Sequence, residues 1–147
     1  MLGAALALAA LAACGHDPVS ISSSDLRHAT ATPACGPADG PAIAIYLANA
    51  PATSPVPPAP YVRIYALQSL DQLPGRTLRL DGDDLGISAW FFATPTQYEA
   101  ATRGTLTVSA VAPDKTIEGF ADLTFPKAGH IVRGFRAAWI PQLTLCG

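Results

Sequence analysis

Short runs of alternating polar and apolar residues, separated by glycine, proline and aspartate, fill the chain from Cys35 onward. Successive side chains of a β-strand point to opposite faces, so this alternation is typical of strands with one buried face. The chain also has fourteen prolines, which interrupt the runs too often for long helices. The sequence therefore predicts an all-β fold over residues 35–147. We expect an antiparallel β-sandwich or open barrel of about seven strands, with one short helix.

Seven segments carry the strand pattern. They are residues 41–48, 61–66, 76–81, 85–93, and three runs around Leu106, Leu123 and Val132. In 61–66, the aliphatic residues are expected to face the core, and Tyr61, Arg63 and Tyr65 the other side. The segment 81–84, Asp-Gly-Asp-Asp, has the composition of a tight turn and predicts a hairpin between 76–81 and 85–93.

The helix is expected at about 95–102. Thr94 is a favourable N-cap, Pro95 suits the first helical position, and Gln97 completes a capping box. In the last two strands, a four-residue loop at 126–129 would place Phe120 opposite Phe135 and Asp122 opposite Arg133.

The first thirteen residues, MLGAALALAALAA, are apolar and uncharged. A bilayer span needs roughly 20 apolar residues, so this segment has the length of a signal-peptide core instead. Leu11-Ala12-Ala13-Cys14-Gly15 then gives leucine, two small residues and cysteine. This motif resembles the lipobox of bacterial lipoproteins, although that family normally has Lys or Arg before the apolar run. The alternative is an ordinary secretory signal with a cysteine there by chance.

The resemblance implies that the signal peptide, residues 1–13, is cut before Cys14. The Cys14 sulfur would then carry a diacylglyceryl group, and its new amine commonly an acyl chain such as palmitate. This lipid anchor would hold the protein on a membrane of the cell envelope. Gly15, rather than the aspartate of inner-membrane retention signals, favours the outer over the inner membrane.

Residues 14–34 are rich in Ser, Thr, Ala and Pro without periodicity, which predicts a flexible tether in which His16 and His28 are solvated. With Cys14 lipidated, Cys35 and Cys146 remain as an even pair outside the cytoplasm, which favours a disulfide. Two free thiols or a metal site are the alternatives, but two cysteines so far apart make a poor zinc signature.

Charge and motifs restrict the chemistry. Nine basic and eleven acidic residues give a net charge of −2 with no run of one sign, so we expect no nucleic-acid partner. The acidic segment 81–84 lacks the remainder of a calcium loop, and we expect no metal and no cofactor. His130 is the only histidine of the predicted domain and G-x-S-x-G is absent, so no catalytic residues are assigned.

Aromatic residues are the candidate binding residues. Tyr61 and Tyr65 project from one face of a strand, and Phe120 and Phe135 are expected to pair opposite the aliphatic face. Exposed rings in such numbers are typical of a binding surface. The alternative is a two-sheet sandwich in which some of these rings lie in the core.

The C-terminal part, from Gly104-Thr105-Leu106-Thr107-Val108 through Gly119-Phe120 and Gly134-Phe135 to Cys146, resembles small β-sandwich lipoproteins of bacterial envelopes. That resemblance implies no enzymatic activity. We therefore expect a non-catalytic lipoprotein that binds an envelope protein, glycan or lipid. A small envelope hydrolase and a purely structural spacer are the alternatives.

Overall fold

The computed structural model describes residues 21–80 and 86–146, and over these ranges the chain is all-β, as predicted. None of the described helical segments is long and apolar enough to span a membrane. The described strands are β1 (His28–Cys35), β2 (Pro41–Ala48), β3 (Tyr61–Ala66), β4 (Arg76–Arg79), β5 (Ile87–Phe92), β6 (Tyr98–Ala100), β7 (Arg103–Val111), β8 (Ile117–Phe125) and β9 (Gly129–Trp139). Three 3-10 turns accompany them: η1 (Ser23–Asp25), η2 (Pro37–Asp39) and η3 (Leu70–Gln72).

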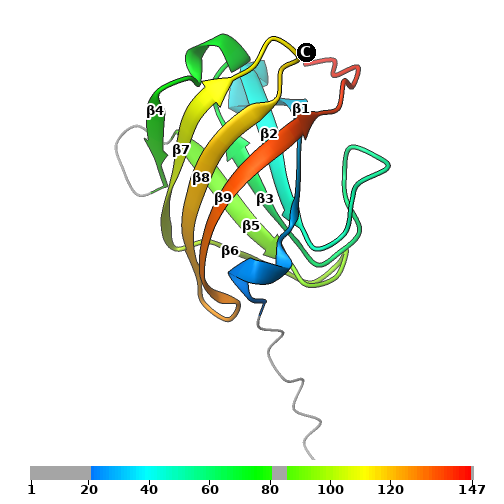
Figure 1. The fold of residues 1–147 in the computed structure, drawn as a ribbon, viewed down its shortest axis with the longest axis vertical. Coiled ribbons are helices and arrows are strands. Elements are labelled where there is room, and N and C mark those ends of the chain that lie inside the picture. Colours follow the sequence, from blue (N-terminus) through cyan, green and yellow to red (C-terminus); the bar gives the residue numbers. More distant parts are fainter. Residues whose placement is uncertain (1–20, 81–85, 147) are drawn as a thin grey trace, which may run out of the picture.

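The strands form one sheet in the order β4-β7-β8-β9-β1-β2-β3-β5-β6. Figure 1 shows this sheet curling into an open barrel. Neighbouring strands are antiparallel, except that β1 and β9 run parallel. Of the two predicted alternatives, the structure therefore has the open barrel.

Contacts around β6 tie the two sides of the curl together. The N–H of Ala101 donates to β5 and that of Thr102 donates to β8, at 2.9 and 2.8 Å. The carboxylate of Glu99 accepts hydrogen bonds from the backbone N–H groups of Lys127 and Ala128, at 3.0 and 2.6 Å. The edge strand β6 is thereby fixed to the turn between β8 and β9.

The core lies inside the curl and is built from inward-facing aliphatic side chains. The largest fully buried ones include Ile45, Leu47, Ile64, Leu106, Ile117, Leu123 and Ile131. Each such side chain contributes about 1.5 to 3 kcal/mol relative to an exposed one. The predicted faces of β3 are confirmed, since Val62, Ile64 and Ala66 all belong to this core.

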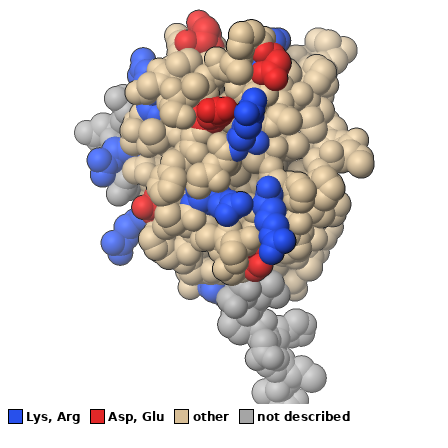
Figure 2. All heavy atoms as spheres, in the orientation of Figure 1, with Lys and Arg blue, Asp and Glu red and all other residues tan. Residues whose placement is uncertain are grey.

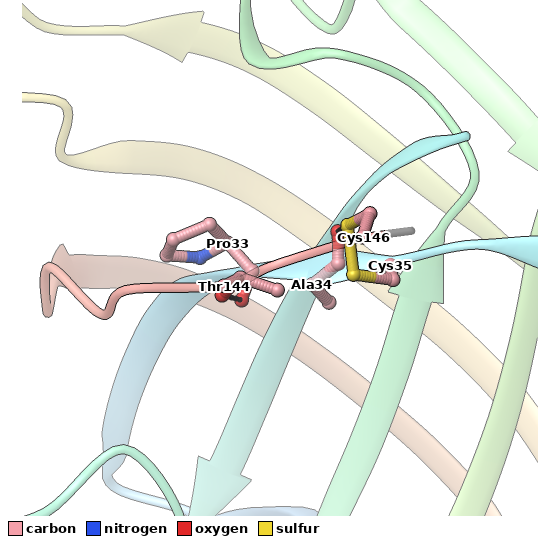
Figure 3. The surroundings of a disulfide bond; sticks show 5 residues. All are labelled: Pro33, Ala34, Cys35, Thr144 and Cys146. Carbon is pink, nitrogen blue, oxygen red and sulfur yellow. Dashed lines mark hydrogen bonds between the residues drawn. A yellow bond between two sulfur atoms is a disulfide. The ribbon is translucent and has the colours of Figure 1, made fainter. Parts of the chain in front are cut away.

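The predicted disulfide is confirmed. Cys35, at the end of β1, is bonded to Cys146, and their Cα atoms are 5.5 Å apart. Beside the disulfide, the hydroxyl of Thr144 donates to the carbonyl of Pro33 at 3.2 Å (Figure 3). The segment that follows β9 is therefore held against β1.

The predicted tether is wrong over its last two thirds, residues 21–34. Residues 21–34 belong to the domain: Leu26 is buried in the core, and β1 lies between β9 and β2. The inward residues of β1 include Ala29 and Ala31, whose small side chains give little hydrophobic contrast with the threonines between them. Residues 14–20, Cys14 and the signal peptide lie outside the described residues.

The predicted helix at 95–102 is also wrong. The Thr94 hydroxyl does accept hydrogen bonds from the N–H groups of Thr96 and Gln97, at 3.4 and 3.1 Å. The carbonyl of Gln97, however, accepts from the N–H of Ala93, which closes a turn, and the chain returns as β6 along β5. Threonine makes the same local bonds in a turn as at a helix start, so the capping pattern alone does not distinguish them.

The predicted hairpin between 76–81 and 85–93 does not form. β4 pairs with β7 at one edge of the sheet, whereas β5 pairs with β3 and β6 near the other edge. The connecting residues 81–85, which include the turn and calcium candidate, lie outside the described residues.

The predicted register of the last two strands is wrong by one residue. Phe120 lies opposite Gly134 and Asp122 opposite Val132. The link between β8 and β9 has three residues, because β9 begins at Gly129, which has the positive φ of 84° that glycine adopts without strain. Since faces alternate along a strand, this shift separates the two phenylalanine rings.

Candidate binding surface

Four aromatic rings run across the outer face of β2, β3, β5 and β6. Tyr46 and Tyr61 have their ring centroids 5.7 Å apart, Tyr61 and Phe92 4.8 Å apart, and Phe92 and Tyr98 5.2 Å apart. The strand pairing places these rings together, because Phe92 is opposite both Tyr61 and Tyr98. We call these four residues the aromatic row.

Exposure rises along the row toward the sheet edge. Tyr46, Tyr61 and Phe92 are buried against Ala44 and Ala48 in a second apolar cluster, separate from the barrel core. Tyr98, on the edge strand β6, is 64% exposed. The row therefore has a packed end that fixes its geometry and a free end that a ligand can reach.

Arg63 lies beside the row, on the same face of β3. It is opposite Tyr46 on β2 and Trp90 on β5. Its Cζ atom is 5.1 Å from the ring centroid of Tyr65, 5.0 Å from that of Trp90 and 4.8 Å from that of Phe92. A guanidinium this close to ring faces is attracted by their negative π-surfaces.

The hydrogen-bonding groups of Arg63 are not satisfied by the described part of the chain. Its Nε atom is buried without a hydrogen-bond partner, and the guanidinium forms no ion pair with a described carboxylate. The rings contact the charge through their faces and offer no acceptor to the N–H groups. We call Arg63, Tyr65, Trp90 and Tyr98 the Arg63 face: the rings of Tyr65 and Trp90 contact the guanidinium, and Tyr98 adjoins it through Phe92.

Burial also changes the acidity of two tyrosines in the row. The pKa of Tyr46 is raised to about 12, mainly by removal from water and then by the nearby Tyr65, while Arg63 acts in the opposite direction. Burial likewise raises the pKa of Tyr61, against the influence of Arg63. Both hydroxyls are thus neutral at ordinary pH.

The protein is expected to lose stability between about pH 10 and 12. In the unfolded chain Tyr46 ionises near its ordinary pKa of 10.0, whereas in the folded protein it ionises only at about 12. The stabilisation is therefore fully present below pH 10 and is lost as the pH rises through the folded pKa, by an amount on the order of 2 kcal/mol. Urea unfolding followed by circular dichroism across this range measures it. Tyr46→Phe is the control, and an equally steep loss in that variant would contradict the assignment.

The sequence-predicted binding residues do not form one surface. Tyr61 and Tyr65 lie on the outer face of β3, where Tyr61 is buried in the aromatic row. Phe120 is 44% exposed on the outer face of β8. Phe135 lies on the inner face of β9, packed against the core and over Gly119.

Sequence reasoning missed the residues that complete the surface. Arg63, Trp90 and Phe92 have a signal in the chain: Arg63 alternates with two tyrosines, and Trp90 and Phe92 are two residues apart, so they must share one face of a strand. Tyr98 has none, because it lies in the segment with the helix pattern. Only the pairing of β3, β5 and β6 brings them together.

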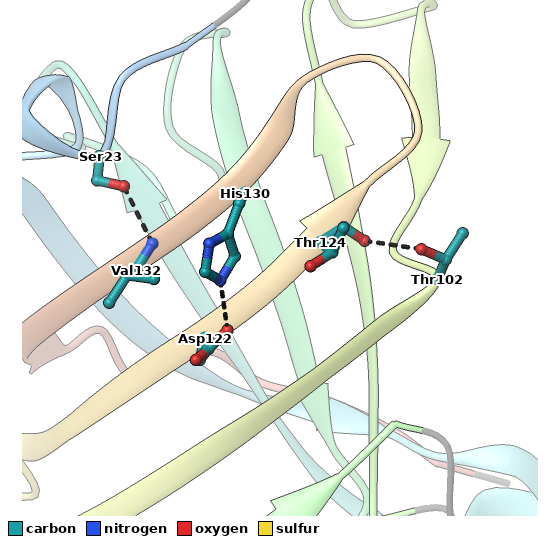
Figure 4. A network of polar contacts seen from close by, with 6 residues as sticks. All are labelled: Ser23, Thr102, Asp122, Thr124, His130 and Val132. Carbon is teal, nitrogen blue, oxygen red and sulfur yellow. Dashed lines mark hydrogen bonds and ion pairs between the residues drawn. The ribbon is translucent and has the colours of Figure 1, made fainter.

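A second polar group lies on the outer face of β8 and β9. The Nε2 atom of His130 is 2.7 Å from Oδ1 of Asp122, and the side chains are 57% and 48% exposed. Figure 4 shows Ser23 close by, but its hydroxyl accepts a hydrogen bond from the N–H of Val132 at 3.0 Å, not from the histidine. The pair is open to water, and within the described residues no serine hydroxyl is bonded to His130.

The charged side chains and the potential metal ligands of the described residues indicate no further binding site. Acidic and basic side chains are interspersed on the face seen in Figure 2, without a continuous patch of either sign. Glu118 and Arg136 form an exposed ion pair at 3.6 Å, of the kind that contributes little to stability. Within residues 21–80 and 86–146, no three His, Cys, Asp or Glu side chains are grouped so as to hold a metal ion.

No family model, curated protein or solved structure matches the chain.

Proposed function

We propose that this chain is a bacterial envelope lipoprotein, anchored through lipid on Cys14, whose β-barrel domain is a non-catalytic binding module. The leader motif supports the anchor. The disulfide supports a compartment outside the cytoplasm, because such bonds persist where conditions are oxidising. Ile21 already belongs to the core, so at most six residues separate it from Cys14, and the proposed anchor would hold the domain close to the bilayer surface.

The observation that carries the binding proposal is the Arg63 face. Its rings are fixed from beneath by packed neighbours, whereas Tyr98 extends into solvent at the sheet edge. A rigid aromatic platform with an unsatisfied cation binds at low entropic cost, since its side chains are already ordered. A structural spacer requires no such arrangement.

Removing the Tyr98 ring tests the proposal. The detergent-solubilised lipoprotein is mixed with purified surface polysaccharide and with peptidoglycan from the producing bacterium, and the bound fraction is measured by co-sedimentation. We expect retention on one of these fractions, weakened about tenfold by Tyr98→Ala, as for an exposed aromatic anchor.

Phe120→Ala is the matched control, because it removes another exposed ring from a different strand, β8. Binding that both variants lose equally, or that neither changes, would contradict the assignment of the surface. If the unaltered lipoprotein binds neither fraction, surface polysaccharide and peptidoglycan are not its ligands.

The second candidate function is a small hydrolase, which the contact between His130 and Asp122 favours. A catalytic base needs a nucleophile within hydrogen-bonding reach and protection from bulk water. The exposed pair has neither among the described residues. Turnover of a chromogenic ester that disappears in His130→Ala but not in Tyr98→Ala would support this alternative over the binding module.

A further inference from the structure

We infer that the Arg63 face binds an acidic sugar, with a carboxylate on the guanidinium of Arg63 and the sugar ring against Trp90 and Tyr98. The inference rests on the proposed binding function and names its ligand class.

The charge of Arg63 favours an anionic ligand. A guanidinium has five N–H donors, and those of Arg63 have no acceptor in the described part of the chain. The three ring faces around it hold the cation in place without using these donors. An incoming anion would therefore meet a fixed, partly desolvated cation, where a charge-assisted hydrogen bond is stronger than in water.

The surroundings of Arg63 favour a singly charged, planar group. Within β2, β3, β5 and β6, Arg63 is the only cation. The only carboxylate of these strands is Glu99, which lies opposite the inward-facing Phe91 and accepts the two hydrogen bonds from the β8–β9 turn. One positive charge, with no competing acid on its face, matches one carboxylate, which the planar guanidinium fork can bind through two parallel bonds.

The rings favour a sugar as the carrier of that carboxylate. The C–H groups of a sugar ring are weakly positive and pack well on the negative face of a tryptophan or tyrosine ring. Trp90 and Tyr65 meet edge to face, with centroids 5.9 Å apart, so their perpendicular rings present surfaces in two directions beside the cation.

The size of the surface also favours a sugar over a protein. The solvent-reaching part of the Arg63 face consists of four side chains. A standard protein interface uses about 20 to 30 residues on each side. Four side chains are too few for such an interface but can contact a small ligand such as a sugar.

Calorimetric titration of the detergent-solubilised lipoprotein tests the inference. The probes are a galacturonate oligosaccharide and the same oligosaccharide after reduction of its carboxyl groups, which keeps the ring and removes the charge. We expect the acidic form to bind about tenfold more tightly or better. In Arg63→Gln this preference should disappear, whereas in Tyr98→Ala both forms should weaken alike.

Two further variants serve as controls for folding and for the loss of an arginine elsewhere. Arg63→Lys keeps the charge and the aliphatic stem, so the domain should fold, but it loses the fork and should bind the acidic probe several-fold more weakly. Arg136→Gln removes an exposed arginine from β9 and should leave both affinities unchanged. If Arg63→Gln does not fold, the weaker binding of the acidic probe by Arg63→Lys decides the test.

The results distinguish a wrong ligand class from a wrong proposed function. Equal binding of the two probes, or an acid preference that survives both Arg63 substitutions, overturns the acidic sugar and leaves the binding module standing. Tyr98-dependent binding to an envelope component that protease destroys, with neither probe bound, overturns it in favour of a protein partner. Absence of binding to the probes and to every envelope fraction overturns both.

Discussion

Replacing Cys35 and Cys146 together by serine is expected to lower the free energy of unfolding by about 4 to 5 kcal/mol. The two cysteines are 111 residues apart in sequence, so the bond closes a loop that spans almost the whole domain. In the chain-entropy model, such a closure restricts the unfolded chain strongly. A domain of this size is stable by only about 5 to 15 kcal/mol, so the loss is a large part of the total. Urea unfolding of the oxidised protein and the double variant measures it.

The control is the unaltered protein after reduction of its disulfide, because Cys35 and Cys146 are then unbonded without any substitution. It should unfold at the same urea concentration as the double variant. We also expect proteolysis beyond residue 140 to increase in both, since Thr144 then keeps only its single hydrogen bond to β1. An unchanged unfolding midpoint would refute the stabilising role of the disulfide.

Replacing Cys14 by alanine is expected to release the protein from the membrane almost completely. One acyl chain gives only marginal binding, with an association constant of about 10⁴ M⁻¹, and each further buried CH₂ adds about 0.8 kcal/mol. Because the proposed anchor has two or three chains on one residue, its loss should reduce the membrane-bound fraction by about a hundredfold or more. Fractionation of cells and metabolic labelling with an alkyne fatty acid measure the two effects.

The cysteine variants serve as controls for one another. The double serine variant at 35 and 146 should take up the fatty-acid label as well as the unaltered protein, while Cys14→Ala should not. A Cys14→Ala protein that remains labelled and membrane-bound would refute the lipoprotein assignment.

The strands that were predictable from sequence are those with large aliphatic residues on one side. In β2 and β3, alternation of Ile and Leu or Val with other residues predicted the bounds, and in β3 also the faces. β1 and β6 lack this contrast, because β1 has only alanine, threonine and proline between His28 and Cys35, and β6 has three residues. The positions of β1 and β6 in the sheet depend on neighbouring strands that are distant in sequence, so no local pattern predicts them.

The candidate surface was predictable only in part for the same reason. That Tyr61, Arg63 and Tyr65 share a face follows from the period of a strand. The contact of Arg63 with Trp90 requires β5 to pair with β3, although β4 lies between them in sequence and is located at the far edge of the sheet. The expected contact of Phe120 with Phe135 depended on the length of one turn, where a single residue reverses the face.

The parallel pairing of β1 with β9 determines when this domain can finish folding. A chain that is threaded through a translocation pore from its amino terminus delivers β1 first and β9 last, so β1 has only β2 beside it until transport is nearly complete. Contacts between such distant segments are slow to form because the intervening chain must be closed into a loop first. If the chain is exported as proposed, the barrel would therefore stay open during passage and close on the far side, where Cys146 emerges to meet Cys35.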